Sequence, residues 1–304
     1  MQGSDYNKDK KLTIGTRGSK LALVQANEVK NLLMSVHPHL RSEYIDIKVL
    51  STRGDRVQDR NLSEIGGKGL FTEEIENALI DGRIDIAVHS LKDMPTQLPD
   101  GLELVCFLER EDVRDAFISD MATSMMDLPL GAIIGTSSLR RQAQTLALRP
   151  DLKIIGFRGN VQTRLKKLDD KLADATFLAV AGLNRLSISD DRIHPVSVDE
   201  LLPAVAQGAI AIEIASHNEV MRSILKPLNH RHTELRVRAE RAMLKILDGS
   251  CRTPIAGLAT INGDLLTLKG RVLETDGTND RCAEVTGPKH NPEAIGIELG
   301  QLLK

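Results

Sequence analysis

The chain has 304 residues, of which 41% are hydrophobic and 27% charged, and this composition excludes a disordered chain, a collagen-like repeat and a coiled coil. Its 40 Lys and Arg against 42 Asp and Glu give a formal net charge of −2, which argues against a protein that must neutralise nucleic-acid phosphates. An aromatic content of 2% without Trp also argues against base stacking, and the length predicts two domains or three small ones.

Over the first 230 residues, short β-branched runs alternate with amphipathic helical patterns. Helical spacing of apolar residues predicts helices at 21–36 and 70–83. The predicted strands lie at 12–16, 44–50, 84–90, 132–138, 153–159 and 176–182. Such alternation is typical of α/β folds, in which crossover helices join mostly parallel strands.

The pattern changes after about residue 230. A long helix is predicted at 233–249, and a final helix at 292–304. Between them, three short strands connected by hairpins are predicted at 258–263, 265–275 and 282–287. This part of the chain therefore predicts a separate, smaller α+β domain.

Two segments of the first 230 residues resemble each other, IGTRGSKLAL at 14–23 and IGTSSLRRQA at 134–143. Each places Gly-Thr at the end of a predicted strand and Ser at the start of a helix, where a hydroxyl can cap free N–H groups. A helix N-terminus also attracts anions. The repetition predicts two similar lobes with equivalent anion-binding points.

Arginines follow the ends of several predicted strands. Ligands of open α/β sheets bind beyond the carboxyl ends of the strands, and the planar guanidinium binds carboxylates through two parallel hydrogen bonds. Each arginine alone is more readily explained as solvated or as part of a salt bridge at a helix end. Together they predict one anion-binding surface, composed of Arg17, Arg140, Arg141, Arg158, Arg164 and Arg185.

The segment HSLKDMP at 89–95 places Asp93 at the same predicted sheet edge. An aspartate after a strand is usually a turn former or a helix cap, but in a basic cleft it could transfer a proton or stabilise a developing cation. Lys92 could form a Schiff base. His89 is expected to be a core or hydrogen-bonded histidine, because no second ligand has a suitable spacing to it, and no metal site is predicted.

Two loops have features that allow more than one interpretation. IGGKGLF at 65–71 lacks P-loop spacing, so a phosphate cradle and a flexible lid carrying Lys68 both stay open. Cys251 lies in the polar loop DGSCRTP at 248–254, either as an ordinary thiol or as a point of covalent attachment. Cys106 is expected in a strand, and Cys282 receives no role.

Targeting and partner signals are sparse. Three cysteines give neither a disulfide framework nor a CxxC metal pair, which favours reduced thiols inside a cell. The first ten residues are polar, and the longest apolar stretches, 177–183 and 204–215, are too short to span a membrane. We expect a cytoplasmic protein without membrane or nucleic-acid partners, and an organellar location stays open if a presequence was removed.

An ordered set of motifs resembles the porphobilinogen deaminase family, the hydroxymethylbilane synthases, from about Ile14 to Gly257. One such motif would be weak, but the ordered set is specific. The matching pieces are TRGSKLAL, TRGD (52–55), GGKGLF, DIAVHSLKDMP, REDVRDAF (110–117), GTSSLRRQ, RGNVQTRLKKL (158–168), AVAGLNRL (179–186), LPAVAQGAI (202–210) and DGSCRTPIAG (248–257).

The resemblance implies a transferase of tetrapyrrole biosynthesis. Such an enzyme links four porphobilinogen molecules head to tail into 1-hydroxymethylbilane, releases ammonia at each step, and carries a dipyrromethane cofactor as a thioether. The cofactor cysteine is then Cys251, and the catalytic aspartate is Asp93, flanked by Lys92 and Ser90.

The resemblance also implies two sets of binding residues, suited to a pyrrole chain rich in acetate and propionate groups. The cofactor would be bound by Cys251, Ser90, Lys92, Thr136, Ser137, Ser138, Arg140, Arg141, Arg158, Gly159, Arg164, Arg185 and Gly208. The substrate would be bound by Arg17, Ser19, Lys68, Arg158, Arg164, Arg185 and Gln207.

The fold implied by the resemblance is a monomer with two α/β lobes like those of periplasmic binding proteins, built on mixed, mostly parallel sheets, plus a smaller C-terminal α+β domain. The first lobe would comprise 12–108 with 209–228, the second 113–203, and the cofactor-cysteine domain 231–304. A two-lobed carboxylate-binding protein without catalytic activity is the alternative, since fold does not decide function. Asp93, Cys251 and the third domain argue against it.

Overall fold

The computed structural model describes residues 11–56, 72–249 and 253–304, and these form two compact units. Unit 1 combines 11–56, 72–110 and 209–234. Unit 2 combines 111–208, 235–249 and 253–304. Each unit therefore includes chain segments that lie far apart in the sequence.

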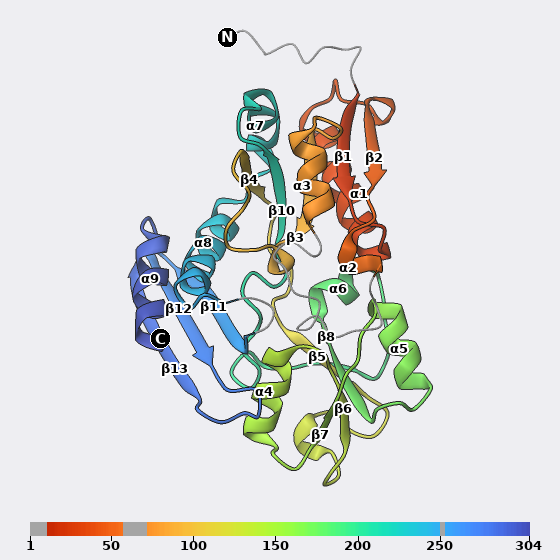
Figure 1. The fold of residues 1–304 in the computed structure, drawn as a ribbon, viewed down its shortest axis with the longest axis vertical. Helices are drawn as coiled ribbons and strands as arrows, with labels where there is room; N and C mark the ends of the chain where they lie inside the picture. The colour runs from red at the N-terminus through yellow and green to blue at the C-terminus, as the bar shows by residue number, and fades with distance from the viewer. Residues whose placement is uncertain (1–10, 57–71, 250–252) are drawn as a thin grey trace. The chain divides into compact units, whose positions relative to one another are not determined.

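Unit 1 contains a five-stranded sheet in the order β2-β1-β3-β10-β4 (Figure 1). β1 is parallel to β2 and β3, whereas β10 is antiparallel to both β3 and β4, so four strands run in one direction. The strands are β1 (Leu12–Thr16), β2 (Ile45–Val49), β3 (Ile86–Ser90), β4 (Leu102–Phe107) and β10 (Ile210–Ala215), and the helices are α1 (Lys20–Val36), α2 (Arg53–Arg56), α3 (Glu73–Ile80) and α7 (Glu219–Leu225).

Helices cover both faces of this sheet. Side chains alternate between the two faces of a strand, and β3 accordingly sends Ile86 and Val88 into one apolar cluster and Ala87 into another. The first cluster includes Val29 of α1, and the second includes Ile75 of α3. Nonpolar burial on both faces explains why β3 has four buried residues in a row instead of an alternating pattern.

Unit 2 begins with a second five-stranded sheet, in the order β7-β6-β8-β5-β9. β6 is parallel to β7 and β8, and β5 is antiparallel to β8 and β9, so again four strands share a direction. The elements are β5 (Asp115–Ser119), β6 (Ile133–Gly135), α4 (Leu139–Leu148), β7 (Lys153–Ile155), α5 (Val161–Asp169), β8 (Ala175–Ala179), α6 (Val180–Arg185) and β9 (Ile193–Pro195).

The predicted repetition of IGTRGS and IGTSSL corresponds to equivalent places in the two sheets. β1 and β6 each stand second in their sheet, between one edge strand and one central strand. The Ser19 hydroxyl accepts a hydrogen bond from the N–H of Ala22 at the start of α1, and the Ser138 hydroxyl does the same for Arg141 at the start of α4. Both serines are therefore N-caps, as the pattern predicts.

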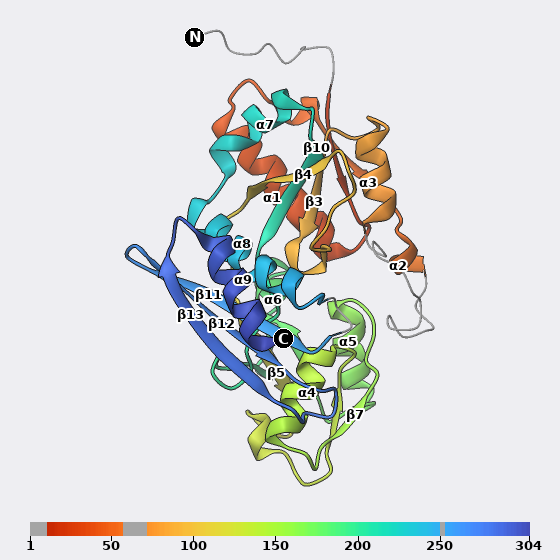
Figure 2. The ribbon, with the colours of Figure 1, turned by 60° about the vertical axis from the view of Figure 1, so that its left-hand side comes forward.

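The C-terminal part of Unit 2 is a three-stranded antiparallel sheet with helices on one face (Figure 2). Gly270 lies where Met243 of α8 and Leu299 and Leu303 of α9 converge, so an added Cβ there would lie 2.6 Å from the Met243 sulfur. The elements are α8 (Arg231–Ile246), whose first turn belongs to Unit 1, β11 (Ile255–Asn262), β12 (Leu265–Val272), β13 (Arg281–Pro288) and α9 (Pro292–Leu303). The two mixed α/β sheets and the smaller α+β part confirm the predicted fold class.

Several element bounds differ from the predicted ones. The run at 176–182 divides into β8 and the helix α6, because a short continuous apolar stretch does not distinguish strand from helix. β6 and β7 are three-residue strands, shorter than predicted. The boundaries proposed for three domains stay a prediction. Among the described residues, no helix is both long and apolar enough to cross a membrane.

Two hairpin glycines provide a test of how tightly the loop after β12 packs on α4. Gly277 and Gly263 both have positive φ, but a Cβ on Gly277 would lie 2.5 Å from the backbone nitrogen of Ala147, whereas one on Gly263 would meet nothing within 4 Å. We expect Gly263→Ala to cost about 1 kcal/mol of folding free energy, and Gly277→Ala about 2 to 5 kcal/mol. Urea unfolding measures both, and equal losses would contradict the tight packing.

Candidate functional site

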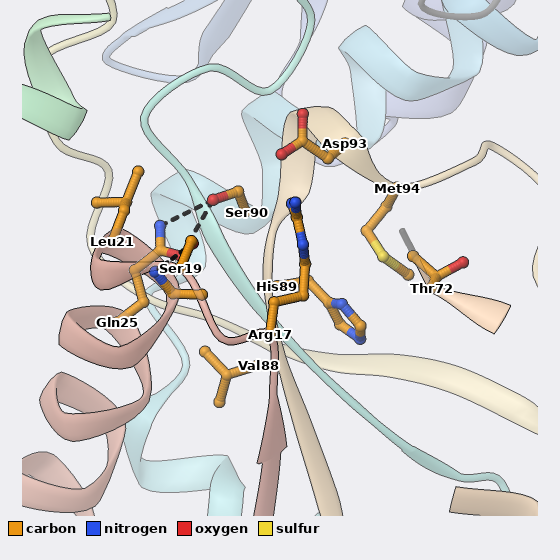
Figure 3. A pocket seen from close by; sticks show the side chains of 11 residues that line it. Arg17, Ser19, Leu21, Gln25, Thr72, Val88, His89, Ser90, Asp93 and Met94 are labelled. Atoms are coloured by element: carbon orange, nitrogen blue, oxygen red, sulfur yellow. Dashed lines mark hydrogen bonds between the residues drawn. The ribbon is translucent and has the colours of Figure 1, made fainter. Parts of the chain in front are cut away.

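Unit 1 has a small cavity of about 70 Å³ at the carboxyl ends of β1 and β3, hereafter the Asp93 pocket (Figure 3). The cavity lies where ligands of open α/β sheets bind. Its walls are formed by Arg17, Ser19, Leu21, Ala22, Gln25, Thr72, Val88, His89, Ser90, Asp93 and Met94. It therefore brings together four residues assigned from the sequence, Arg17, Ser19, Ser90 and Asp93.

Asp93 ends a 3₁₀ turn, Leu91–Asp93, that directly follows β3. The turn is fixed by the buried Leu91 side chain and by the Leu91 N–H, which donates to the carbonyl of Ala209 at 3.0 Å. Asp93 is half-buried, and the side chain of Arg17 extends toward the end of the pocket where Asp93 lies (Figure 3). Lys92 is exposed and is not part of the pocket wall.

Ser90 is oriented by a buried partner that the sequence did not reveal. The Gln25 amide nitrogen lies 2.9 Å from the Ser90 hydroxyl, and the Gln25 amide oxygen lies 3.1 Å from it, so the hydroxyl can accept one bond and donate another. Gln25 is 3% exposed on the inner side of α1. A polar residue at a predicted buried helix position was the available signal, because such groups are normally hydrogen-bonded.

His89 lies under the pocket and is hydrogen-bonded, as predicted. Its Nε2 lies 2.9 Å from the Glu213 carboxylate of β10, and both side chains are buried. Glu76 of α3 adds a second buried carboxyl group, and burial raises its pKa above the ordinary value. Together with His89, which contributes to the pocket wall, these two carboxyl groups form a buried polar cluster next to the pocket.

In Unit 2, Arg140 and Arg141 of α4 share one carboxylate, that of Asp115 at the start of β5. The Asp115 side chain is fully buried, and each arginine is 5% exposed. Arg141 donates to Oδ1 through Nε at 3.1 Å and Nη2 at 2.7 Å, and Arg140 places Nη2 2.7 Å from Oδ2. The two arginines follow β6 as predicted, but they are buried rather than exposed on an open surface.

This cluster has one positive charge more than its carboxylate balances. Burial alone would raise the pKa of the Asp115 carboxyl, but the charges of Arg140 and Arg141 outweigh it and hold that pKa well below its usual range. Burial lowers the pKa of the Arg140 guanidinium, although Asp115 opposes this. Arg140 Nε is buried and has no hydrogen-bond partner among the described residues. An anionic, carboxylate-bearing group therefore fits this cluster.

Gln207 and Gly208 lie beside the cluster. The Gln207 amide donates to the Asp115 carboxylate at 3.0 Å and to the Val113 carbonyl at 2.8 Å. The Gly208 carbonyl accepts from Arg185 at 3.1 Å. Gly208 has a φ of +87°, and a Cβ there would lie 2.5 Å from the Glu111 carbonyl oxygen, so the position requires glycine.

The remaining predicted binding residues of Unit 2 are involved in loop structure. The Thr136 hydroxyl accepts from the Ser138 N–H at 3.1 Å, and the Ser137 hydroxyl accepts from the Phe157 N–H at 2.9 Å. The Gly159 carbonyl accepts from Arg164 Nε at 2.9 Å. These bonds shape the loops after β6 and β7.

Arg158 also takes part in a hydrogen bond that shapes a loop. Its backbone carbonyl accepts from Lys167 Nζ at 3.0 Å, which ties the loop after β7 to α5. Arg158 lies in the loop after β7 and Arg164 lies in α5, and the contacts of both with a ligand stay predictions.

The described structure does not bring all of the predicted site residues together. Cys251 and Lys68 lie outside the described residues. Arg17 belongs to Unit 1, whereas the other five arginines belong to Unit 2, so the single surface made by all six stays a prediction.

Cys106 is buried in β4, as predicted, and burial raises the pKa of its thiol to about 12; Cys282 is exposed.

Asp115 is the main residue that the sequence reasoning missed. It lies in the motif REDVRDAF at 110–117, which was recognised as part of the resemblance without any role for its acids. An aspartate at the start of an apolar strand, in a protein with a paired arginine motif, was the available signal. A buried carboxylate needs a charged partner, and the two arginines supply it.

Two solved structures of low sequence identity show a limited likeness in fold. A periplasmic substrate-binding protein of an ABC transporter from Coxiella burnetii is 13% identical, with a TM-score of 0.43 over 71% of this chain and 91% of that one. A periplasmic binding protein of Salmonella typhimurium with high arginine specificity is 11% identical, with a TM-score of 0.40 over 72% of this chain and 91% of that one.

Sequence comparisons cover nearly the whole chain. The family model "Porphobilinogen deaminase, dipyromethane cofactor binding domain" matches residues 12–223, and "Porphobilinogen deaminase, C-terminal domain" matches 234–304. The porphobilinogen deaminase of Paracoccus denitrificans is 54% identical over 96% of this chain and 93% of its own length. That of Nitrobacter hamburgensis is 52% identical over 96% and 92%. The chain belongs to the porphobilinogen deaminase family.

Proposed function

We propose that the chain is a hydroxymethylbilane synthase that condenses four porphobilinogen molecules head to tail, with Asp93 as its catalytic acid group and Cys251 as the attachment point of its dipyrromethane cofactor. The observation that carries the residue assignment is the Asp93 pocket, which gathers a carboxylate, an arginine and three hydroxyl groups at the carboxyl ends of β1 and β3. Membership of the family supports the activity.

Each coupling step breaks one bond and forms another. The bond between the aminomethyl carbon of porphobilinogen and its nitrogen breaks, and ammonia leaves. A carbon–carbon bond then forms to the free α-carbon of the preceding pyrrole, and that carbon loses a proton. When bound, the dipyrromethane supplies the first such pyrrole. Positive charge therefore develops on the incoming ring before the new bond forms.

Asp93 is suited to stabilise this positive charge. A carboxylate held beside the developing cation lowers the barrier, and it needs no reorganisation because the 3₁₀ turn already fixes its backbone. Arg17 and Ser19 on the same pocket wall are suited to bind a substrate carboxylate, the first by charge and the second at the N-terminus of α1. The pocket thus has separate groups for chemistry and for binding.

The Arg140–Arg141–Asp115 cluster is suited to bind cofactor carboxylates. Two guanidinium groups and one carboxylate leave a positive charge, and Arg140 Nε has no described hydrogen-bond partner. We assign acetate or propionate binding to this cluster, together with Ser137 and Arg158 on loops, Arg164 of α5 and Arg185 of α6. Lys92 and Lys68 are assigned supporting roles by the family pattern alone.

The finer assignments concern the cell and the assembly. We propose a cytoplasmic monomer that acts on porphobilinogen and the growing pyrrole chain, without nucleic-acid or membrane partners. The alternative, a carboxylate-binding protein without catalytic activity, is not favoured, because the chain matches a cofactor-binding family model over 12–223.

Covalent loading tests the function directly. Apo-protein from cells that make no porphobilinogen should gain the mass of two linked pyrrole units on Cys251 when porphobilinogen is added, as shown by intact mass and peptide mapping. Arg140→Lys keeps the charge but loses the planar fork, so loading should slow about tenfold.

Arg149→Lys is the matched control, because Arg149 binds Asp151 and loop carbonyls at the far end of α4. An unmodified wild-type Cys251 would refute the synthase. Equal loading by both arginine variants would remove Arg140 from cofactor binding.

Asp93→Asn should fold normally but lose turnover by at least about 100-fold, because an amide cannot stabilise the cation as a carboxylate does. Steady-state formation of the linear tetrapyrrole measures this. Asp100→Asn, in the exposed turn just before β4, is the control and should leave the rate unchanged. Retention of more than about a tenth of the wild-type rate would exclude Asp93 from the mechanism.

Asp115→Asn should destabilise the protein by about 3 to 5 kcal/mol near neutral pH, because it leaves two buried guanidinium groups without a carboxylate. The folded-state pKa of Asp115 is depressed, so its contribution is present above the unfolded value of about 4 and is lost only as pH falls through the folded value. Urea titrations should therefore give a constant difference from about pH 7 to about pH 5 and a smaller one below about pH 4. A difference that already disappears at about pH 5 would contradict the assignment.

A further inference from the structure

Residues 202–208, LPAVAQG, are the last residues of Unit 2 before the chain enters Unit 1 at residue 209, and they include the predicted site residues Gln207 and Gly208. This 202–208 segment has no helix or strand of its own, yet most of it is buried. Its conformation therefore depends on hydrogen bonds to other elements. Those bonds come from α4 at one end and from the C-terminal part of Unit 2 along its length.

α4, the helix that carries Arg140 and Arg141, holds the first residue of the segment. The fully buried Gln144 amide donates to the Leu202 carbonyl at 3.0 Å and accepts from the Leu202 N–H at 2.9 Å. Arg140 Nη1 donates to the same carbonyl at 2.8 Å. These bonds fix the start of the segment relative to the helix that carries the arginine pair.

The C-terminal part holds the middle of the segment at two points. The Gly257 N–H of β11 donates to the Pro203 carbonyl at 3.0 Å. Glu240 of α8, with no exposed surface, accepts from the Ala206 N–H at 2.6 Å through one carboxylate oxygen. Its other oxygen accepts from the Ala259 N–H of β11 at 2.9 Å. One carboxylate therefore joins the segment to the strand that begins at Ile255.

Backbone strain at Ala206 indicates why such a bond is needed. Ala206 has a φ of +61°, in the left-handed region that costs a residue with a Cβ about 1 to 2 kcal/mol. Strained backbone persists where the surroundings over-determine it, and it is concentrated at functional sites. The charge-assisted bond from Ala206 to Glu240 stabilises this conformation, and Gln207, the next residue, is thereby aimed at Asp115.

We infer that Glu240 is a positioning residue for the Arg140–Arg141–Asp115 cluster. Through its bond to Ala206 it orients Gln207 toward Asp115. Through its bond to Ala259 it fixes the cluster relative to β11, which begins four residues after Cys251 in the sequence. Glu240 touches neither substrate nor cofactor in this scheme. The inference rests on the proposed function, because it concerns delivery of the cofactor to this cluster.

A double-mutant cycle on cofactor loading tests the inference. Apo-protein variants are mixed with porphobilinogen, and the appearance of the modified Cys251 peptide is followed by mass spectrometry. Glu240→Gln keeps the shape but presents an amide N–H₂ group to one of the two backbone N–H donors, and it should slow loading about tenfold. Gln207→Ala should slow loading to a similar extent. If Glu240 acts through Gln207, the double variant should be no slower than Gln207→Ala alone.

Val285→Ala is the control for general loss of stability. Val285 is a buried residue of β13 in the same part of Unit 2, and it makes no hydrogen bond to the 202–208 segment. It should lower the melting temperature while loading at the wild-type rate. If Glu240→Gln does not fold, Glu240→Asp, which keeps the charge but cannot reach both N–H groups, replaces it in the cycle.

The outcomes separate the two proposals. Multiplicative slowing in the double variant, or equal loading by Glu240→Gln and Val285→Ala, would overturn the positioning role while leaving the synthase intact. Failure of the wild-type protein to load would overturn the proposed function, and the inference with it.

Discussion

The buried carboxylate of Asp115 is the interaction on which the second unit depends. It accepts hydrogen bonds from Arg141 and Gln207 and lies in ion-pair contact with Arg140, so it joins β5, α4 and the 202–208 segment. Burying these three charged groups carries a desolvation cost, and the single carboxylate balances only one of the two positive charges. The cluster therefore retains one positive charge that no carboxylate balances, and this charge is the basis for the proposed binding of a ligand carboxylate.

The two five-stranded sheets share the same local structure at one strand-to-helix connection. In each, Gly-Thr lies at the end of a strand or directly across it, a serine caps the following helix, and an arginine lies within the first turn or just before it. In Unit 1 this arrangement opens into the Asp93 pocket, whereas in Unit 2 the arginines are buried against Asp115. The same local backbone thus lines a cavity in one unit and carries a buried ion-pair cluster in the other.

Much of this could be predicted from sequence. Hydrophobic periodicity placed β1, β2, α1, α8 and α9 within a few residues, because each has a clear pattern and a clear end. Periodicity failed at α6, where Val180, Ala181, Gly182 and Leu183 continue the apolar run of β8 and are all buried.

The site was predicted as a set of residue types, but not as a set of contacts. The rule that ligands bind beyond strand ends led to Arg17, Asp93, Arg140 and Arg141. It said nothing of Asp115, Gln25 or Glu240, because these partners come from elements distant in sequence, and only the folded backbone brings them within hydrogen-bonding distance.

The strand order of Unit 1 has a consequence for synthesis of the chain. β10 is an interior strand, paired on one side with β3 and on the other with β4, yet it follows them by more than a hundred residues. The sheet of Unit 2, in contrast, is complete within the contiguous stretch 115–195. During synthesis on a ribosome, the second sheet can therefore form first. β3 and β4 lack their shared neighbour until residues 210–215 have emerged, so their strand edges stay unpaired until then. The domain that contains Asp93 is therefore the later one to form, although its first strands are made earliest.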